Sequence, residues 1–70
     1  MQEFNLEKHE YIELCNLLKT LGLCENGGAA KAVISDGQVK LNGEVETRKK
    51  CKLYPGSIVE YLDQQIIIKK

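Results

Sequence analysis

The 70-residue sequence has no tryptophan, one histidine and only two serines, which leaves little for an enzyme to use. Nucleophilic catalysis by serine needs a hydroxyl and a histidine base that can meet, and only Ser35, Ser57 and His9 are available. Both serines fall at predicted turns, and His9 is expected to be exposed at the start of a helix. No G-x-G-x-x-G or Walker sequence is present. The sequence therefore predicts a protein without catalytic activity.

Cysteine is also scarce, with Cys15, Cys24 and Cys51 making an odd number that a disulfide framework would not use up. No two of them have the C-x-x-C spacing of a zinc site, so we expect neither a metal nor a cofactor. Cys15 falls beside a leucine stripe and Cys51 alternates inward with Leu53, which is typical of small core residues. This use of cysteine indicates a reducing, cytoplasmic location.

Long hydrophobic runs are missing too: no apolar stretch reaches 18 residues, and the first ten residues lack the pattern of a signal peptide. We therefore expect no membrane segment. With 43% hydrophobic and 29% charged residues, the chain reads as one monomeric globular domain over residues 1–70. So small a domain buries only about 60% of the surface of its unfolded chain, so function is expected on the surface.

What the sequence does have is separated charge. The formal net charge is zero, but residues 1–30 carry five acids and two bases, whereas residues 31–70 carry eight bases and five acids. These counts give −3 and +3, so a neutral protein can still present a basic face to a polyanion.

Two helices are predicted in the first half of the chain. The segment "YIELCNLLKTLG" (residues 11–22) carries a stripe of leucines at helical spacing and ends at Gly22, a natural left-handed cap. The second helix lies in "NGGAAKAVISDG", with Asn26 as N-cap and Gly37 as C-terminal cap. Its expected buried stripe is Ala30, Val33 and Ile34. The short link between the helices predicts a tight helical hairpin or corner.

A β-hairpin is predicted around Asn42-Gly43, with Gly43 at positive φ. A two-residue loop would place Val39 opposite a glutamate. A three-residue loop that includes Leu41 instead pairs Val39 with Val45 and Lys40 with Glu44, and is favoured because it matches apolar and opposite-charge partners.

A second hairpin is predicted near the C-terminus. A two-residue loop at Asp63-Gln64 would pair Tyr61 with Ile66 and Val59 with Ile68, all four on one face. Before it, "YPGS" (residues 54–57) has the sequence of a type II turn.

The period of "EFNL" near the N-terminus adds one short strand. Together these elements predict an α+β fold, a two-helix hairpin packed on a small antiparallel sheet.

The segment "NGEVETRKKCK" concentrates the positive charge. If residues 48–53 are extended, Arg48, Lys50 and Lys52 share one face at intervals of about 6.6 Å, which suits the phosphates of a nucleic acid. The alternative is a solvated sheet edge, where lysines discourage edge pairing.

Residues outside that segment extend the predicted basic surface. Lys31 is expected on the outer face of the second helix and Lys40 in the hairpin that follows. Gly27 and Gly28 would let a phosphate approach the helix N-terminus closely, the alternative being a merely flexible cap.

The stretch "GGAAKAVISDGQVKLNGEVETRKKCKLYPGSIV" resembles the RNA-binding domain of the ribosomal protein S-four type, or αL motif, over about residues 11–62. Length and "ETRKKCK" are most similar to the small bacterial stand-alone YbcJ-type proteins. The specific features are the joint spacings of Lys31, Gly37, Val39, Asn42-Gly43 and Pro55-Gly56. In one departure, "N-G-G" stands where the family often has "S-R-S", so Gly27 replaces an arginine.

This resemblance implies a non-catalytic module that binds structured RNA of the ribosomal or transfer RNA class through the second helix, the hairpin and the segment that follows. The implied RNA-binding residues are Gly27, Gly28, Lys31, Lys40, Asn42, Gly43, Arg48, Lys49, Lys50 and Lys52. Recognition is expected to use RNA shape and backbone, because the four aromatic residues are not expected to gather beside the cations. These aromatic residues are Phe4, Tyr11, Tyr54 and Tyr61.

The alternative is a protein-interaction module that joins a larger assembly through a sheet edge or an acidic first helix. The acidic residues that suggest it are Glu3, Glu7, Glu10 and Glu13.

Overall fold

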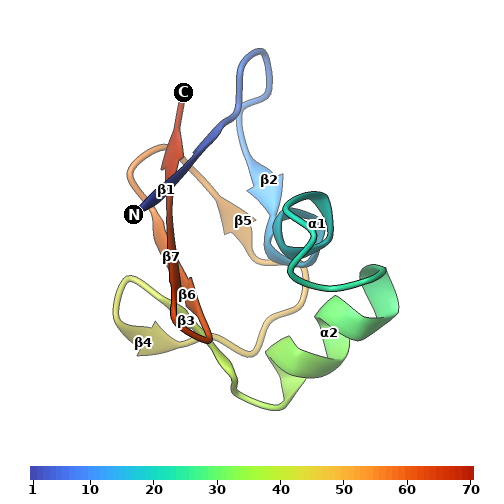
Figure 1. The fold of residues 1–70 in the computed structure, drawn as a ribbon. Helices are drawn as coiled ribbons and strands as arrows, with labels where there is room; N and C mark the ends of the chain where they lie inside the picture. The colour runs from blue at the N-terminus through green and yellow to red at the C-terminus, as the bar shows by residue number, and fades with distance from the viewer.

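The computed structural model describes all residues 1–70 as a five-stranded sheet, a two-stranded sheet and two helices (Figure 1). The strand order of the larger sheet is β1-β7-β6-β3-β4, and β2 pairs with β5 in the smaller one. Both helices lie on the same side of the larger sheet (Figure 1). The elements are β1 (Gln2–Asn5), β2 (Ile12–Glu13), α1 (Leu14–Thr20), α2 (Gly27–Ser35), β3 (Val39–Leu41), β4 (Glu44–Val45), β5 (Lys52–Leu53), β6 (Ile58–Tyr61) and β7 (Gln64–Lys69).

The predicted α+β class is confirmed, and the larger sheet proves to be mixed. The N-terminal strand β1 forms as expected but runs parallel to β7, with Gln2 opposite Ile66 and Phe4 opposite Ile68. Parallel neighbours cannot be joined by a tight turn. In this chain everything from β2 to β6 lies between them, so no local turn sequence marks the pairing.

Helix α1 buries most of its predicted leucine stripe: Leu14, Leu17 and Leu18 are fully buried, and Leu21 at its C-terminal end is partly buried. The helix begins later than its periodicity indicates, because Ile12 and Glu13 form β2 and pair with β5. At the other end, Gly22 has a φ of 75°, the left-handed conformation that ends many helices.

Helix α2 has the predicted caps at both ends. The Ala29 amide donates to Asn26 Oδ1 at 2.8 Å, and Gly37 has a φ of 80°. Ala30 and Ile34 are fully buried, and this face packs against α1. The small Ala30 side chain lets the two helices approach closely.

The hairpin of β3 and β4 has a two-residue loop, with Lys40 opposite Val45, so the three-residue loop favoured from the sequence is wrong. Asn42 and Gly43 both have positive φ, 52° and 88°, as a type I′ turn requires. The mistaken register assumed that Val45 needed an apolar partner. Because β4 is a short edge strand and Val45 is 56% exposed, burial hardly constrains that register.

Replacing Gly43 with valine should lower the free energy of unfolding by about 1–2 kcal/mol, because a β-branched residue is strained in the left-handed region. A Cβ at Gly43 would meet no atom within 4 Å, so the loss would report backbone strain rather than a clash. Urea unfolding measures the loss, and Gly43→Asn is the matched control, since asparagine tolerates positive φ. A Gly43→Val protein as stable as wild type would contradict the turn.

The hairpin of β6 and β7 closes through Leu62 and Asp63, not through Asp63-Gln64 as predicted. Val59 therefore lies opposite Ile66, two residues away from the predicted partner. A shift of two residues keeps every side chain on its face of the sheet. The residues predicted for the buried face are accordingly all buried: Val59, Tyr61, Ile66 and Ile68.

The predicted Pro55-Gly56 turn is confirmed, with Gly56 at a φ of 96° and the Ser57 amide donating to the Tyr54 carbonyl at 3.1 Å. The turn also sets the register of β7. The Gly56 amide donates to the Ile68 carbonyl at 2.8 Å, and the Ile68 amide donates to the Ser57 carbonyl at 2.9 Å.

The core lies between the larger sheet and the helices and contains no buried polar or charged side chain. Cys15 and Cys51 are buried in it, as predicted for small core residues, and Cys24 is buried as well; all three thiols are free. Neither helix has the length and apolar character needed to cross a membrane.

Candidate nucleic-acid interface

Of the cations of residues 48–52, together called the basic loop, only Lys52 lies on a strand, and the others lie at a turn. The Cys51 amide donates to the Arg48 carbonyl at 3.2 Å, and only Lys52 and Leu53 are extended, in β5. The predicted strand over residues 48–53 is therefore wrong, although Cys51 and Leu53 are buried as that alternation required. Arg48, Lys49, Lys50 and Lys52 are all exposed.

Helix α1 holds the basic loop in place through its first amides. The Leu14 amide donates to the Cys51 carbonyl at 2.9 Å, and the Cys15 amide donates to the Lys49 carbonyl at 3.1 Å. The N-cap residue Glu13 makes no side-chain cap hydrogen bond, so the loop carbonyls satisfy amides that a helix start leaves unpaired. This explains why the segment turns, and it fixes the loop backbone against the core.

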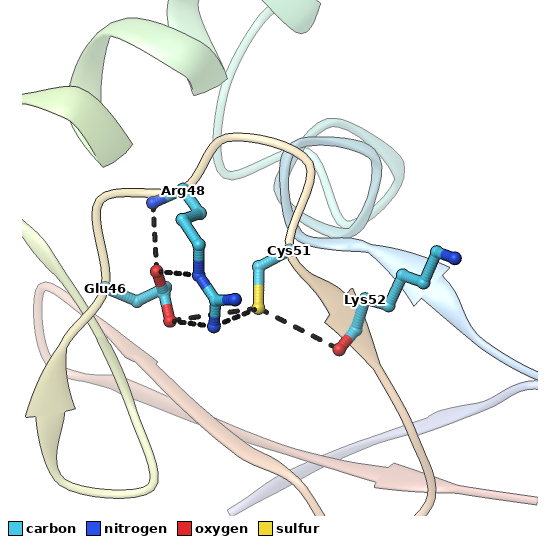
Figure 2. A network of polar contacts seen from close by, with 4 residues as sticks. All are labelled: Glu46, Arg48, Cys51 and Lys52. Carbon is cyan, nitrogen blue, oxygen red and sulfur yellow. Dashed lines mark hydrogen bonds and ion pairs between the residues drawn. The ribbon is translucent and has the colours of Figure 1, made fainter.

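Glu46 and Arg48 form a bidentate ion pair just before the turn (Figure 2). Arg48 Nε donates to Glu46 Oε2 at 2.9 Å, Arg48 Nη2 donates to Oε1 at 3.0 Å, and the Arg48 amide also donates to Oε2 at 3.0 Å. The Arg48 side chain remains 74% exposed, whereas that of Glu46 is 14% exposed. Arg48 thus has a fixed orientation, and its charge is partly neutralised within the chain.

The ion pair shifts the pKa of both partners. Hydrogen bonds from the Arg48 side chain and amide lower the pKa of Glu46 to about 2, and the same pairing raises the pKa of Arg48 further above its ordinary value. Burial, and then the Glu46 charge, raise the pKa of the Cys51 thiol. Cys51 is thus a neutral thiol at physiological pH, not an activated nucleophile.

The Glu46 pair should make stability depend on pH below neutrality. Because the folded pKa of Glu46 is depressed, the stabilisation is complete above its unfolded pKa near 4.3 and is lost as the pH falls through about 2. Glu46→Gln should therefore be less stable than wild type at pH 7, and the difference should shrink between about pH 5 and pH 2. Urea unfolding across this range measures the difference. Glu44→Gln, an exposed carboxylate on β4, is the control, and an equal trend there would contradict the assignment.

The predicted residues of the β3–β4 hairpin lie on the other side of the sheet from the helices or at its tip. Val39 is buried, so the alternating side chain of Lys40 points away from the core, with Glu60 as its cross-strand neighbour. Asn42 lies at the tip, where its Oδ1 accepts from the Ile58 amide at 2.8 Å. The structure does not bring Lys40 together with the basic loop.

The predicted residues of α2 lie in its first two turns. Asn26 caps the Ala29 amide, while the amides of Gly27 and Gly28 are among the first of the helix and have no partner within it. A Cβ added at Gly28 would lie 3.3 Å from Asn26 Oδ1, whereas Gly27 faces open space. Lys31 is half-buried one turn further on, rather than fully exposed.

Two aromatic residues lie beside the basic loop, contrary to the expectation from the sequence. The rings of Tyr11 and Tyr54 have centroids 5.9 Å apart, and Lys52 Nζ lies 5.0 Å from the centroid of Tyr11. Sequence reasoning missed them because it placed Tyr11 on a helix. The alternating patterns of "YIE" and "KLY", read as two paired strands, could have revealed the pair.

The predicted acidic face of the first helix is wrong, because all four glutamates lie before α1. Glu3 lies on β1, Glu7 and Glu10 lie between β1 and β2, and Glu13 lies on β2 just before α1. Helix α1 is short because its first predicted turn is used for pairing with β5.

Chemically, the region is equipped to bind anions. The side chains of Arg48, Lys50 and Lys52 line a shallow hollow together with Cys51 and Tyr54. No group of three or more histidine, cysteine, aspartate or glutamate side chains is placed to hold a metal ion.

Comparison with known proteins places this geometry in a family. The family model for the S4 domain matches residues 4–69. The YbcJ protein of Escherichia coli (strain K12) is 47% identical over 66 residues, covering 94% of both chains. The probable ribosome maturation protein RlbA of Bacillus subtilis (strain 168) is 39% identical over 51 residues, covering 73% of this chain and 72% of that protein.

Solved structures agree. The solution structure of E. coli YbcJ, described as having an αL motif involved in RNA binding, matches with a TM-score of 0.75 and 44% identity over 100% of this chain and 89% of that one. The 30S ribosomal protein S4e of Thermoplasma acidophilum shares the fold, with a TM-score of 0.67 and 20% identity over 83% of this chain and 31% of that one. With the helix pair, the Asn42-Gly43 hairpin and the Pro55-Gly56 turn all in place, the chain belongs to the S4 domain family.

Proposed function

We propose that this protein is a non-catalytic RNA-binding module that recognises structured RNA through the basic loop. One observation carries the proposal. The basic loop, with its four exposed cations, is hydrogen-bonded to the N-terminus of α1 through the Lys49 and Cys51 carbonyls. A loop whose backbone is already fixed loses little conformational entropy when phosphates bind to it. The names of YbcJ and of its solved structure, which refer to RNA binding, support this function.

The basic loop carries most of the phosphate contacts in this proposal. Lys49, Lys50 and Lys52 are free of carboxylate partners and act as mobile point charges, whereas Arg48 is oriented by Glu46 and presents its free Nη1. Each cation that neutralises a phosphate releases a counterion, which drives association.

The second helix and the hairpin contribute secondary contacts. The unpaired amides of Gly27 and Gly28 bind one phosphate at the N-terminus of α2, and Lys31 supports them from the next turn. In the hairpin, Lys40 and the backbone of Gly43 contact a further part of the RNA, and Asn42 can offer only its Nδ2, since its Oδ1 already accepts from Ile58.

The rigid backbone of the basic loop and the name of one relative support the proposed class of RNA. A basic loop with a fixed backbone suits a folded RNA, whose phosphates also hold fixed positions. The name of RlbA refers to ribosome maturation, so we propose ribosomal RNA as the target class. We also propose that the protein acts in the cytoplasm and is a monomer.

Crosslinking the protein to RNA in living cells, followed by sequencing of the bound RNA, tests this proposal. We expect ribosomal RNA fragments from base-paired regions to be enriched over a control with Lys49, Lys50 and Lys52 replaced by glutamine. Recovery of no RNA above that control would contradict the proposed function.

A protein-interaction function is the second candidate, supported by two exposed apolar side chains, one of them at the sheet edge, rather than by acidic residues. Val45 on the edge strand β4 is 56% exposed and Leu62 in the β6–β7 loop is 74% exposed. A salt titration separates the two functions, because affinity that rests on phosphate contacts falls linearly with salt on logarithmic scales. Binding of a partner protein that is insensitive to salt would favour the sheet edge.

A further inference from the structure

The outer face of the small β2–β5 sheet carries two tyrosines side by side. Ile12 lies opposite Leu53 in an antiparallel register, so the next pair along is Tyr11 and Tyr54. Because side chains alternate across a strand and Leu53 is buried, both tyrosines point outward. Their rings lie 5.9 Å apart and are inclined at 51°.

These two rings contribute little to the core. Tyr54 is 50% exposed and Tyr11 is 37% exposed, whereas Tyr61, on the buried face of β6, is 8% exposed. Aromatic rings left in water gain free energy when a ligand covers them, since each can bury a large apolar area. The fold thus leaves two neighbouring aromatic rings partly exposed, so a ligand can cover them.

Cations lie beside the two tyrosines. Lys52 Nζ lies 5.0 Å from the centroid of Tyr11, and Tyr54 lines the same hollow as Arg48, Lys50 and Lys52. Glu13, the cross-strand neighbour of Lys52, also lies on this face, and its Oε1 accepts from Asn16 Nδ2 at 3.5 Å. A π-face bordered by cations has the chemistry to bind a nucleobase and its phosphates together.

We propose that Tyr54, supported by Tyr11, stacks one unpaired nucleobase while Lys50 and Lys52 hold the phosphates on either side. The base must be unpaired, because the faces of bases inside a duplex are covered by their neighbours. This inference rests on the proposed RNA-binding function and refines it. The preferred target is a duplex that ends in an overhang or contains a flipped-out nucleotide, and any base can serve, since every base has a π-face.

Three RNA stem-loops with one common stem test the inference. The first ends bluntly, the second carries a two-nucleotide overhang, and the third carries the same overhang without its bases. The abasic overhang keeps the phosphates and removes only the stacking. Fluorescence anisotropy should show wild type binding the complete overhang at least about 5-fold tighter than the abasic one, as expected for base–aromatic stacking. This ratio should persist at high salt, whereas both affinities fall.

Substitutions of Tyr54 identify the stacking residue. Tyr54→Leu, at an exposed position, should bring the ratio close to one, and Tyr54→Phe should recover most of it because the ring remains. Tyr54→Trp would give the chain its sole tryptophan, whose fluorescence should be quenched by the complete overhang but not by the abasic one. Thermal unfolding confirms that each variant is folded.

The possible results distinguish the stacking site from the RNA-binding function on which it rests. Equal affinity of wild type for the complete and abasic overhangs, with salt-dependent binding to both, would overturn the stacking site and leave RNA binding in place. A ratio unchanged in Tyr54→Leu would also overturn it, because the base would then stack elsewhere. Failure of wild type to bind any of the three RNAs would overturn both.

Discussion

Glutamine at Lys49, Lys50 and Lys52 together should weaken the binding of a ribosomal RNA stem-loop by at least about 10-fold. Each lysine is exposed and has no carboxylate partner, so its charge is available to a phosphate. The substitution leaves the Glu46–Arg48 pair intact, and the carbonyls that accept from α1 belong to the backbone, so the loop should keep its shape. A salt titration of affinity should show a slope flatter by about two to three units.

A matched variant carries the same loss of charge elsewhere. Glutamine at Lys8, Lys69 and Lys70 also removes three exposed lysines, but from the β1–β2 loop and the C-terminal end of the chain. We expect its affinity to fall much less. Equal weakening by the two variants would mean that overall charge, not the basic loop, attracts the RNA. Unaltered affinity in the loop variant would mean that these lysines do not bind RNA and are only solvated surface residues.

Leu53→Ala should destabilise the protein by about 2–5 kcal/mol, a large share of the stability of so small a domain. Leu53 is fully buried, and β5 pairs with β2 over only two residues, so packing rather than hydrogen bonding holds this strand. The same strand carries Lys52 and leads into Tyr54. Urea unfolding measures the loss of free energy.

Leu62→Ala removes the same atoms from the β6–β7 loop, where the side chain is 74% exposed, and should change stability by less than about 0.5 kcal/mol. Similar losses in the two variants would contradict the placement of Leu53 in the core. If Leu53→Ala remains folded at low temperature, its RNA affinity should also fall, because the basic loop and the tyrosines depend on the position of β5.

Features that depend on near neighbours were predictable from the sequence. The Asn26 cap and the left-handed Gly22 and Gly37 lie where predicted, since each is determined by hydrogen bonds or dihedral preferences within one turn of helix. The alternation of Val59 and Tyr61 likewise identified the buried face of β6. Local chemistry specifies these features whatever the remainder of the chain does.

Strand registers were decided by the tertiary structure. Both hairpins pair differently from the prediction, because their partners are held from outside the hairpin. Ile58 binds the backbone and side chain of Asn42, and the Pro55-Gly56 turn binds Ile68. In the β6–β7 hairpin the shift of two residues keeps each side chain on its face, and in the β3–β4 hairpin the shift of one residue affects an edge strand whose Val45 is exposed. Neither shift costs much local energy, so contacts between distant segments select the register.

The candidate site shows the same division. The sequence alone identified the cations of residues 48–52, their exposure and the inward alternation of Cys51 and Leu53. That the segment forms a turn was decided by the tertiary structure, because the loop carbonyls accept hydrogen bonds from the otherwise unpaired amides at the start of α1. The pairing of β2 with β5 then placed Tyr11 beside Tyr54. Residues so far apart in the chain meet because burial of Leu53 favours that pairing, whereas the local alternation of each segment indicates a strand without specifying its partner.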